Sequence, residues 1–273
     1  KAYCGAEILA QTMHNLLPIR GAKVRDSLGW SGYLDDAVQQ NADTEVYFAS
    51  HNWPVWGAAN IVEFITKQRD MYRYMHDQTV RLMNAGYTQN EIASRVKLPK
   101  SLASYFSVRG YYGDIRHNVK AIYQFYLGHY DGNPARLDAL PPADSAKRYV
   151  ALMGGATKAV EAAQKSFDAG DYRWTAELLN HVVFADGGNT AAKTLLARTY
   201  EQMGYMAESA TWRNSYLTAA AELRNGPPTK GVSRASFVEV LAQTPVERFL
   251  DAMAAALNAE AAEDKTYKIN MVF

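Results

Sequence analysis

The chain has 273 residues, of which 48% are hydrophobic, and its 29 basic and 28 acidic residues leave a formal net charge of +1. A charge this balanced argues against a nucleic-acid partner. No apolar run approaches the roughly eighteen residues that a membrane span needs. Cys4 is the only cysteine, so the chain forms no internal disulfide.

The first segment, residues 1–26, gathers polar side chains that are suited to binding. Glu7 offers an anionic oxygen to a metal, and Arg20 offers a planar fork that matches a tetrahedral oxyanion such as sulfate or phosphate. Asn15 lies between these two residues in the sequence. The alternative is the solvated end of an amphipathic helix, which explains Arg25 and Asp26 but not the coincidence of the other three residues.

Residues 44–50 are β-branched and aromatic and predict a short strand, which Pro54 cannot continue. His51 therefore follows a strand end and lies between two indoles, Trp53 and Trp56. A histidine in this setting delivers a neutral nitrogen to zinc, with an aromatic wall that limits solvent. The alternative is a buried histidine that is hydrogen-bonded in a turn.

Apolar residues then recur at helical spacing from 58 to 84, which predicts one long helix ended by Gly86. Its stripe is rich in Met and Tyr, and such stripes are usually core. Thr88 and Glu91 have the spacing of a capping box and predict a short helix that Pro99 closes.

A further helix is predicted over residues 114–126, with His117 in its first turn. Helix N-termini favour anions and disfavour a proton on imidazole. His117 is therefore predicted either to contact a bound anion or to act as an acid that is charged only when the anion is present. The alternative is a helix-start histidine that faces solvent.

An internal repeat follows. The turn glycines Gly170 and Gly204 lie 34 residues apart, and Ala176 and Ala210 follow them at the same offset. Thirty-four residues is the period of tetratricopeptide-type helical pairs, which often bind peptides. Two units are few, so dimer contacts or packing on a catalytic domain are the favoured roles. The predicted helices are 156–169, 172–185, 190–203 and 205–224.

Residues 226–232 replace helical periodicity with turn-forming residues and predict a linker. Residues 245–259 then predict an amphipathic helix, and residues 266–273 alternate as a strand. A helix followed by a strand is typical of the start of an α+β domain.

Five separated motifs resemble the linear primary alkyl sulfatases and occur in that family's order. They are residues 4–7, 14–26, 49–57, 109–113 with 117–118, and 130–134. The resemblance spans roughly residues 1–225. It implies a multidomain fold: residues 1–57 end an αβ/βα metallo-β-lactamase-type domain, 58–225 form a mostly α-helical TPR-like dimerisation domain, and 233–273 start an α+β sterol-carrier-like domain after the linker.

The resemblance also implies roles for particular residues. Glu7 and His51 match zinc ligands, and Asn15 and Arg20 match sulfate-contacting positions. His117 matches a histidine that lines the sulfate pocket and protonates the leaving group. We expect the alkyl groove to be lined by Trp53, Trp56, Tyr111 and Tyr112, and Tyr112 also to bind substrate.

The implied reaction is zinc-dependent hydrolysis of a primary alkyl sulfate ester, with two zinc ions in each active site. The family's His-x-His-x-Asp-His metal loop is absent, so we expect the chain to be part of a larger enzyme, periplasmic or secreted, whose remaining ligands lie upstream. We expect a homodimer whose long helix 58–84, with Met71 and Met75 in its stripe, reaches a second subunit. The rivals are another metallo-β-lactamase-fold hydrolase, acting on phosphoesters or lactams, and a non-catalytic helical-repeat scaffold.

Overall fold

The structure is a computed structural model that describes residues 1–229, 234–266, 268 and 270. It contains two compact units, Lys1–Gly226 and Pro227–Phe273. The division falls inside the predicted linker. No helix in the described part of the chain combines the length and the apolar character that crossing a membrane requires.

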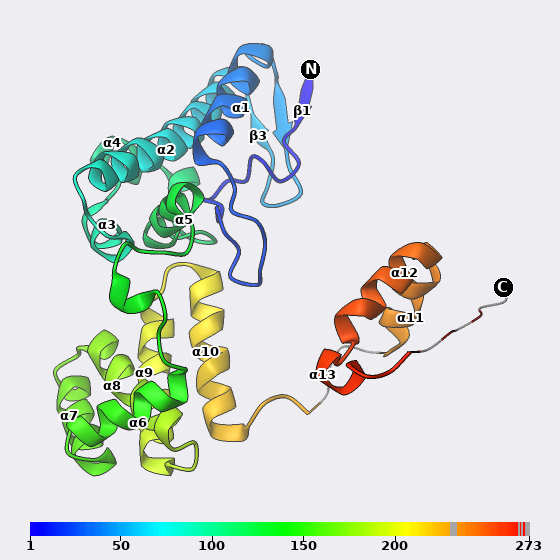
Figure 1. Cartoon of the computed structure of the whole chain (residues 1–273). Helices are drawn as coiled ribbons and strands as arrows, with labels where there is room; N and C mark the ends of the chain where they lie inside the picture. The colour runs from blue at the N-terminus through cyan, green and yellow to red at the C-terminus, as the bar shows by residue number, and fades with distance from the viewer. Residues whose placement is uncertain (230–233, 267, 269, 271–273) are drawn as a thin grey trace. The chain divides into compact units, whose positions relative to one another are not determined.

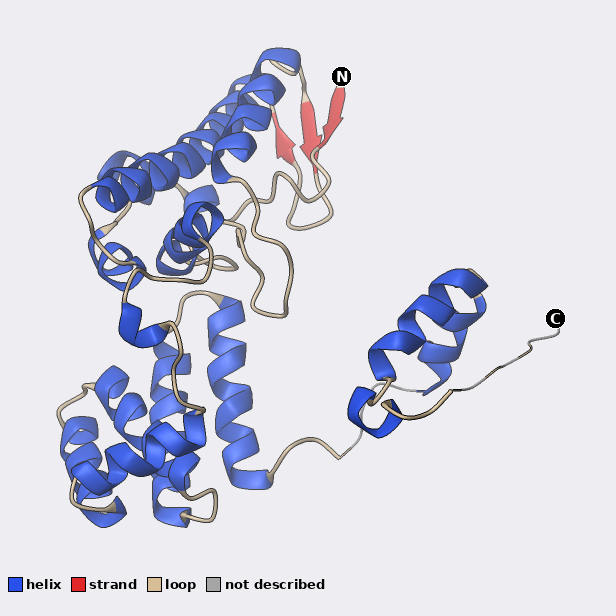
Figure 2. Cartoon of the chain, viewed as in Figure 1, coloured by secondary structure: helices blue, strands red, loops and turns tan. Residues whose placement is uncertain are grey.

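A small sheet opens the first unit (Figures 1 and 2). It consists of β1 (Ala2–Cys4), β2 (Val46–Phe48) and β3 (Val55–Trp56); β1 pairs with β2 in parallel, and β2 pairs with β3 antiparallel. The predicted strand is thus confirmed at its centre. Between β1 and β2 lies helix α1 (Ser27–Gln40), which the sequence analysis did not predict. Two serines interrupt its apolar face, and both are buried with Trp30 and Leu34.

The long helix α2 (Ala58–Asn84) is confirmed over its predicted range, and it lies along α1 (Figure 1). The dimer arm assigned to it is wrong. Met71 and Met75 are fully buried in a core that this chain forms by itself, together with Leu9, Leu16, Trp30 and other residues. This core contains residues from both sides of the predicted boundary at residue 57, so α2 packs on the segment that precedes it.

The capping box is confirmed: Thr88 N donates to Glu91 Oε2 at 2.9 Å, and α3 (Gln89–Arg95) starts there. The helix ends at Arg95, before Pro99. A short helix α4 (Lys100–Ala103) and a 3-10 turn (Phe106–Val108) lead to α5 (Ile115–Leu127), which the sequence predicted to within one residue. Ile92 of α3 and Val119 of α5 share a small core with Leu82 of α2.

The helical repeat contains α7 (Ala156–Asp168), α8 (Tyr172–Ala185), α9 (Thr190–Met206) and α10 (Ala210–Asn225), preceded by α6 (Pro142–Leu152). The four predicted helices are confirmed with one correction. Gly170 makes the expected turn with φ of +78°. Gly204 instead lies inside α9, where a Cβ atom would come within 2.9 Å of Leu217. It serves the close packing of α9 on α10 rather than a turn.

The second unit contains α11 (Arg234–Ala242), α12 (Val246–Met253) and α13 (Ala259–Ala262). The predicted helix 245–259 stops at Met253 and gives way to a 3-10 turn, Ala254–Ala256. The predicted strand 266–273 lies mostly outside the described residues. The metallo-β-lactamase-type and sterol-carrier-like assignments therefore remain predictions.

The burial of the α2 stripe makes a prediction for stability. Replacing Met71 by Ala should lower the free energy of unfolding by about 2–5 kcal/mol, because the change leaves a cavity in a packed core. Met206→Ala is the matched control, since Met206 is 73% exposed and should change stability by less than about 0.5 kcal/mol. Urea unfolding measures both variants. Equal, small effects would show that the stripe is not core.

Candidate functional site

The irregular segment of residues 13–20 is fixed against the start of α5. Gly113 N donates to Met13 O at 2.7 Å, and Met13 N donates to Arg109 O at 3.0 Å. The fully buried Asn118 accepts from Leu16 N at 2.9 Å and donates through Nδ2 to His14 O at 2.8 Å. Position 113 has to be glycine, because a Cβ atom would lie 2.7 Å from His14 O.

This segment forms one wall of a cleft of about 540 Å³ whose other wall is α10. Asn15 is 1% exposed, and its Nδ2 lies 3.4 Å from Thr211 Oγ1 while its Oδ1 has no partner. Arg20 is exposed at the cleft and forms no ion pair among the described residues. The cleft is lined by Asn15, Pro18, Ile19, Arg20, Tyr112, Thr211, Asn214, Ser215, Thr218, Ala219 and Glu222.

The structure thus brings together three of the residues predicted to bind substrate: Asn15, Arg20 and Tyr112. The carbonyl of Tyr112 accepts hydrogen bonds from Ser209 Oγ at 2.8 Å and from Thr211 Oγ1 at 3.1 Å. These bonds tie the cleft to the start of α10. The contribution of α10 was not predicted, because no local pattern in the sequence links it to a segment almost 200 residues earlier.

Glu7 and His51 face each other, with 3.6 Å between Glu7 Oε1 and His51 Nε2. Two ligand atoms bound to one tetrahedral zinc lie about 3.3–3.5 Å apart, since each Zn–N or Zn–O bond is about 2.0–2.1 Å long. The pair therefore fits two positions of a zinc site. No group of three or more possible metal ligands occurs within the residues that the structure describes, so any complete site needs further ligands.

The backbone around this pair is strained. In the described part of the chain, the non-glycine residues with positive φ are Ala6 (45°) and Asn52 (68°), which adjoin Glu7 and His51. Ser50 N donates to Ala6 O at 3.0 Å, and Gln11 N donates to Asn52 Oδ1 at 3.1 Å. These two bonds hold both strained turns side by side. Strain of this kind is often found at functional sites.

The aromatic wall predicted around His51 is wrong. The His51 side chain is 60% exposed, and Trp53 and Trp56 are 59% and 65% exposed. Trp53 instead packs on Phe106 at a ring distance of 5.7 Å, and Phe106 packs on Tyr111 at 5.2 Å. Trp53 and Tyr111 thus belong to one apolar surface, while His51 stays open on the side of Glu7.

His14 lies between these two sets of residues. It is 8% exposed, and its ring packs against Tyr112 at 4.9 Å and against Trp30 at 5.5 Å. Burial lowers the pKa of His14, and the nearby Arg25 lowers it further. His14 and Glu7 both line a cavity of about 460 Å³. His14 therefore connects Glu7, with which it lines this cavity, to Tyr112 of the anion cleft.

His117 is held by both of its ring nitrogens. Nε2 lies 2.5 Å from Leu17 O, and because a carbonyl only accepts, Nε2 carries the proton. Nδ1 accepts from the indole N–H of Trp212 at 3.4 Å. The solvent-facing alternative is thus wrong, and His117 links the segment 13–20, α5 and α10.

The fold and the site define a class: a helical-repeat protein in which α10 closes a polar cleft that contains Asn15 and Arg20, beside a carboxylate–imidazole pair. Residues 88–226 match the family model for alkyl sulfatase dimerisation. The chain belongs to the alkyl sulfatase family.

Known relatives support this assignment. Over its whole length the chain is 49% identical to a linear primary-alkylsulfatase from Pseudomonas sp., and the match covers 41% of that protein. Over 96% of its length it is 46% identical to an (R)-specific secondary-alkylsulfatase from Pseudomonas sp., and the match covers 39% of that protein. A solved structure of the stereoselective inverting sec-alkylsulfatase Pisa1 from Pseudomonas sp. superposes with a TM-score of 0.83 at 46% identity, covering 85% of this chain and 37% of that one. The chain thus spans about two fifths of the length of these curated relatives.

The position of Asn118 makes a prediction. Asn118→Ala should lower the free energy of unfolding by about 2–4 kcal/mol, since it leaves Leu16 N and His14 O without partners in a buried place. The exposed Asn90 is a matched control, and Asn90→Ala should have little effect. Chemical denaturation compares the two. A loss in the Asn118 variant no larger than in the control would show that the side chain does not anchor the segment.

Proposed function

We propose that the full-length protein hydrolyses alkyl sulfate esters to an alcohol and inorganic sulfate, and that this chain supplies the sulfate-binding side of the active site. The observation that carries the proposal is the convergence of Asn15, Arg20 and Tyr112 on one cleft, with Glu7 and His51 held on the adjoining segments. Membership of the alkyl sulfatase family supports it.

In the proposed complex the sulfate group lies between Asn15 and Arg20. The guanidinium of Arg20 donates two parallel hydrogen bonds to sulfate oxygens, and it stabilises the charge that develops during transfer of the sulfuryl group. The Asn15 amide is held by the wall of the cleft and so needs no reorganisation. Tyr112 lines the same cleft as Asn15, and its ring packs on the ring of His14.

Glu7 and His51 are proposed to hold zinc, with the other ligands, and those of a second ion, supplied from outside these 273 residues. Bound zinc would lower the pKa of a water molecule toward neutrality and so provide the nucleophile. Glu7 supplies an oxygen and His51 a neutral nitrogen, which is the mixed set that zinc prefers.

His117 remains the proposed acid for the leaving alkoxide, with two structural requirements. Its Nε2 proton is committed to Leu17 O, so donation to substrate requires that this bond open when the ester binds. Nδ1 accepts from the Trp212 N–H, so acid catalysis also requires that Nδ1 exchange this bond for a proton, because loss of the Nε2 proton would otherwise leave an imidazolate.

The alkyl chain is proposed to lie on the apolar surface of Trp53, Phe106 and Tyr111. We propose primary alkyl sulfates such as dodecyl sulfate as substrates. Assays with primary and secondary alkyl sulfates, phosphate monoesters and lactams separate this proposal from its rivals. Hydrolysis of a phosphoester or lactam alone would identify a different hydrolase, and no hydrolysis at all would favour a scaffold.

Arg20→Lys tests the anion contact. It should lower kcat/KM for dodecyl sulfate by about tenfold or more although the charge is kept, because an ammonium cannot make the paired contacts of a guanidinium. Arg148→Lys on the exposed face of α6 is the control. Wild-type kinetics in the Arg20 variant would remove Arg20 from the active site.

His51→Ala tests the metal assignment. The purified full-length variant should hold less zinc than the wild type, and activity should fall with it, because one ligand of a preformed site is lost. His129, which is exposed, provides the control substitution. Elemental analysis gives the zinc content per protomer. Undiminished zinc in the His51 variant would exclude ligation by His51.

We also propose that the full-length protein is a homodimer, which the match to a dimerisation family supports. With the α2 stripe buried, the contact must lie elsewhere. The connection between α5 and α6 is long and mostly exposed, and exposed apolar side chains on such a surface are typical of an interface. Its exposed leucines are Leu137 (70%) and Leu140 (46%), and Leu127 (52%) ends α5 directly before it.

The double substitution Leu137→Asp and Leu140→Asp should therefore release monomers, because charges in an apolar contact lose their hydration. Leu257→Asp in the second unit, where Leu257 is 66% exposed, is the control. Light scattering at micromolar concentration measures the mass. A monomeric wild type, or a double variant that stays dimeric, would contradict this interface.

A further inference from the structure

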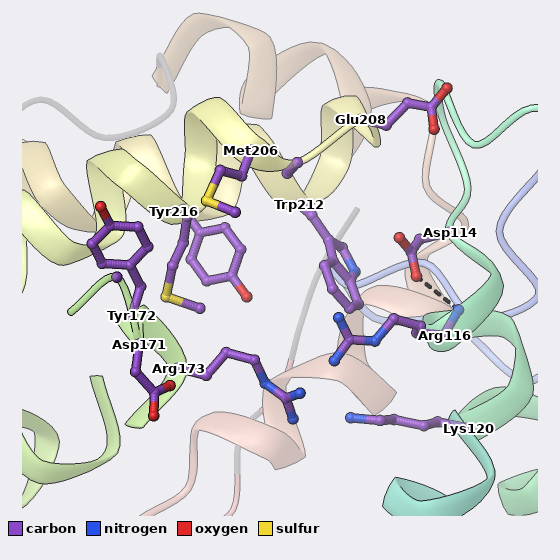
Figure 3. A pocket seen from close by; sticks show the side chains of 13 residues that line it. Asp114, Arg116, Lys120, Asp171, Tyr172, Arg173, Met206, Glu208, Trp212 and Tyr216 are labelled. Atoms are coloured by element: carbon purple, nitrogen blue, oxygen red, sulfur yellow. Dashed lines mark hydrogen bonds between the residues drawn. The ribbon is translucent and has the colours of Figure 1, made fainter. Parts of the chain in front are cut away.

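A second polar cavity lies between the start of α5, the start of α8 and α10 (Figure 3). Its volume is about 500 Å³, which is within the range of small-molecule sites. Three cationic side chains line it: Arg116 and Lys120 from one face of α5, and Arg173 from the first turn of α8. Figure 3 shows all three extending into the same space.

The positive charge of this cavity is not balanced by ion pairs in the described part of the chain. The three acidic residues in its wall have other partners. Asp114 caps α5 by accepting from Arg116 N at 2.7 Å, Asp171 caps α8, and Glu208 pairs with Arg109 at 2.8 Å. Burial lowers the pKa of Lys120, and Arg116 and Arg173 lower it further. Like charges held this close together are stabilised by a bound anion.

The remaining wall is apolar and aromatic. Met203 and Met206 at the end of α9 line it together with Trp212 and Tyr216 of α10. The guanidinium carbon of Arg116 is 5.9 Å from the centre of the Trp212 ring. A ligand that fills this space therefore combines an anionic group, which the three cations receive, with an apolar part that lies on Met and Trp.

We propose that this cavity is a second binding site for the anionic head of an alkyl sulfate or alkyl sulfonate, separate from the cleft of Asn15 and Arg20. The anion site follows from the three cations and the cavity; the choice of a sulfate-bearing amphiphile rests on the proposed function. The two sites share a wall: Trp212 lines this cavity and donates to His117, which in turn donates to Leu17 in the segment that carries Asn15 and Arg20.

Calorimetric titration of the full-length protein tests the proposal. The probe is 1-octanesulfonate below its micelle-forming concentration, which a sulfate ester hydrolase cannot cleave. The titration is made in an Arg20→Ala background, so that the first cleft is disabled. Binding should remain in this background, and adding Arg173→Gln should weaken it by about tenfold or more. Arg148→Gln is the control and should change it by less than about twofold.

Lys120→Met, which keeps the length of the side chain, provides a second variant and should weaken binding as well. Unchanged thermal midpoints show that the variants are folded. Absence of sulfonate binding in the Arg20→Ala background, or equal affinity of the Arg173 variant and the Arg148 control, would overturn the site. A parallel titration with sodium sulfate shows whether the site binds free sulfate as well as the head group of an alkyl sulfonate. Equal affinity for sulfate and sulfonate would retain the anion site and refute the role of the apolar wall.

The probe is not hydrolysed, so this experiment is independent of turnover. A full-length protein that binds octanesulfonate here but cleaves no sulfate ester would refute the proposed function and leave the second site in place. A protein that cleaves dodecyl sulfate but binds no sulfonate at the second site would support the proposed function and refute the second site.

Discussion

One buried side chain, that of Asn118, holds the arrangement on which the site depends. Its amide pairs with two backbone groups of an irregular segment, the N–H of Leu16 and the carbonyl of His14. Each such bond contributes only about 1 kcal/mol net, but a buried backbone group without a partner costs about 1–3 kcal/mol. The segment therefore has one favourable position on α5, and that position places Asn15 and Arg20 on the cleft.

The need of buried backbone groups for hydrogen-bond partners also explains why helix α2 is part of the core and not an arm that extends from it. Residues 8–14 have no secondary structure of their own, and their backbone groups need partners. Trp30 Nε1 donates to Ile8 O, Gln68 Nε2 donates to Ala10 O, and Tyr72 Oη accepts from His14 N. Helices α1 and α2 thus supply both the apolar floor and the polar contacts beneath the functional segment. Burial raises the pKa of Tyr72, so its hydroxyl remains a neutral partner.

Local patterns in the sequence predicted the local structure well. The period of α2, the capping box at Thr88 and the turn at Gly170 each depend on neighbours within one or two helical turns, and all three are confirmed. The interpretation of the α2 stripe was wrong, because periodicity shows that a face is apolar but not what covers it. Gly204 has the spacing of a turn glycine, yet close helix packing demands glycine as well.

The site divides in the same way. The sequence predicted Glu7, Asn15, Arg20, His51 and Tyr112 as functional, and the structure brings Glu7 to His51 and Asn15 to Tyr112 and Arg20. The sequence did not predict the roles of Thr211 and Trp212, because α10 contacts the segment of residues 13–20 and the start of α5 only in the tertiary fold. No pattern in the sequence predicted the cluster of Arg116, Lys120 and Arg173 either. Two of these residues lie on α5 and one lies on α8, and only the packing of the helices brings them together.

Amide hydrogen exchange of the full-length protein tests most directly whether the segment is fixed on α5. The account predicts that the amide of Leu16, which has no secondary-structure partner, exchanges as slowly as the core amides of α5, because its bond to Asn118 opens only when the core opens. Gly132, in the exposed connection after α5, provides the reference for an unprotected amide. If Leu16 exchanged as fast as Gly132, the segment would not be held by Asn118, and the preformed anion cleft would not exist.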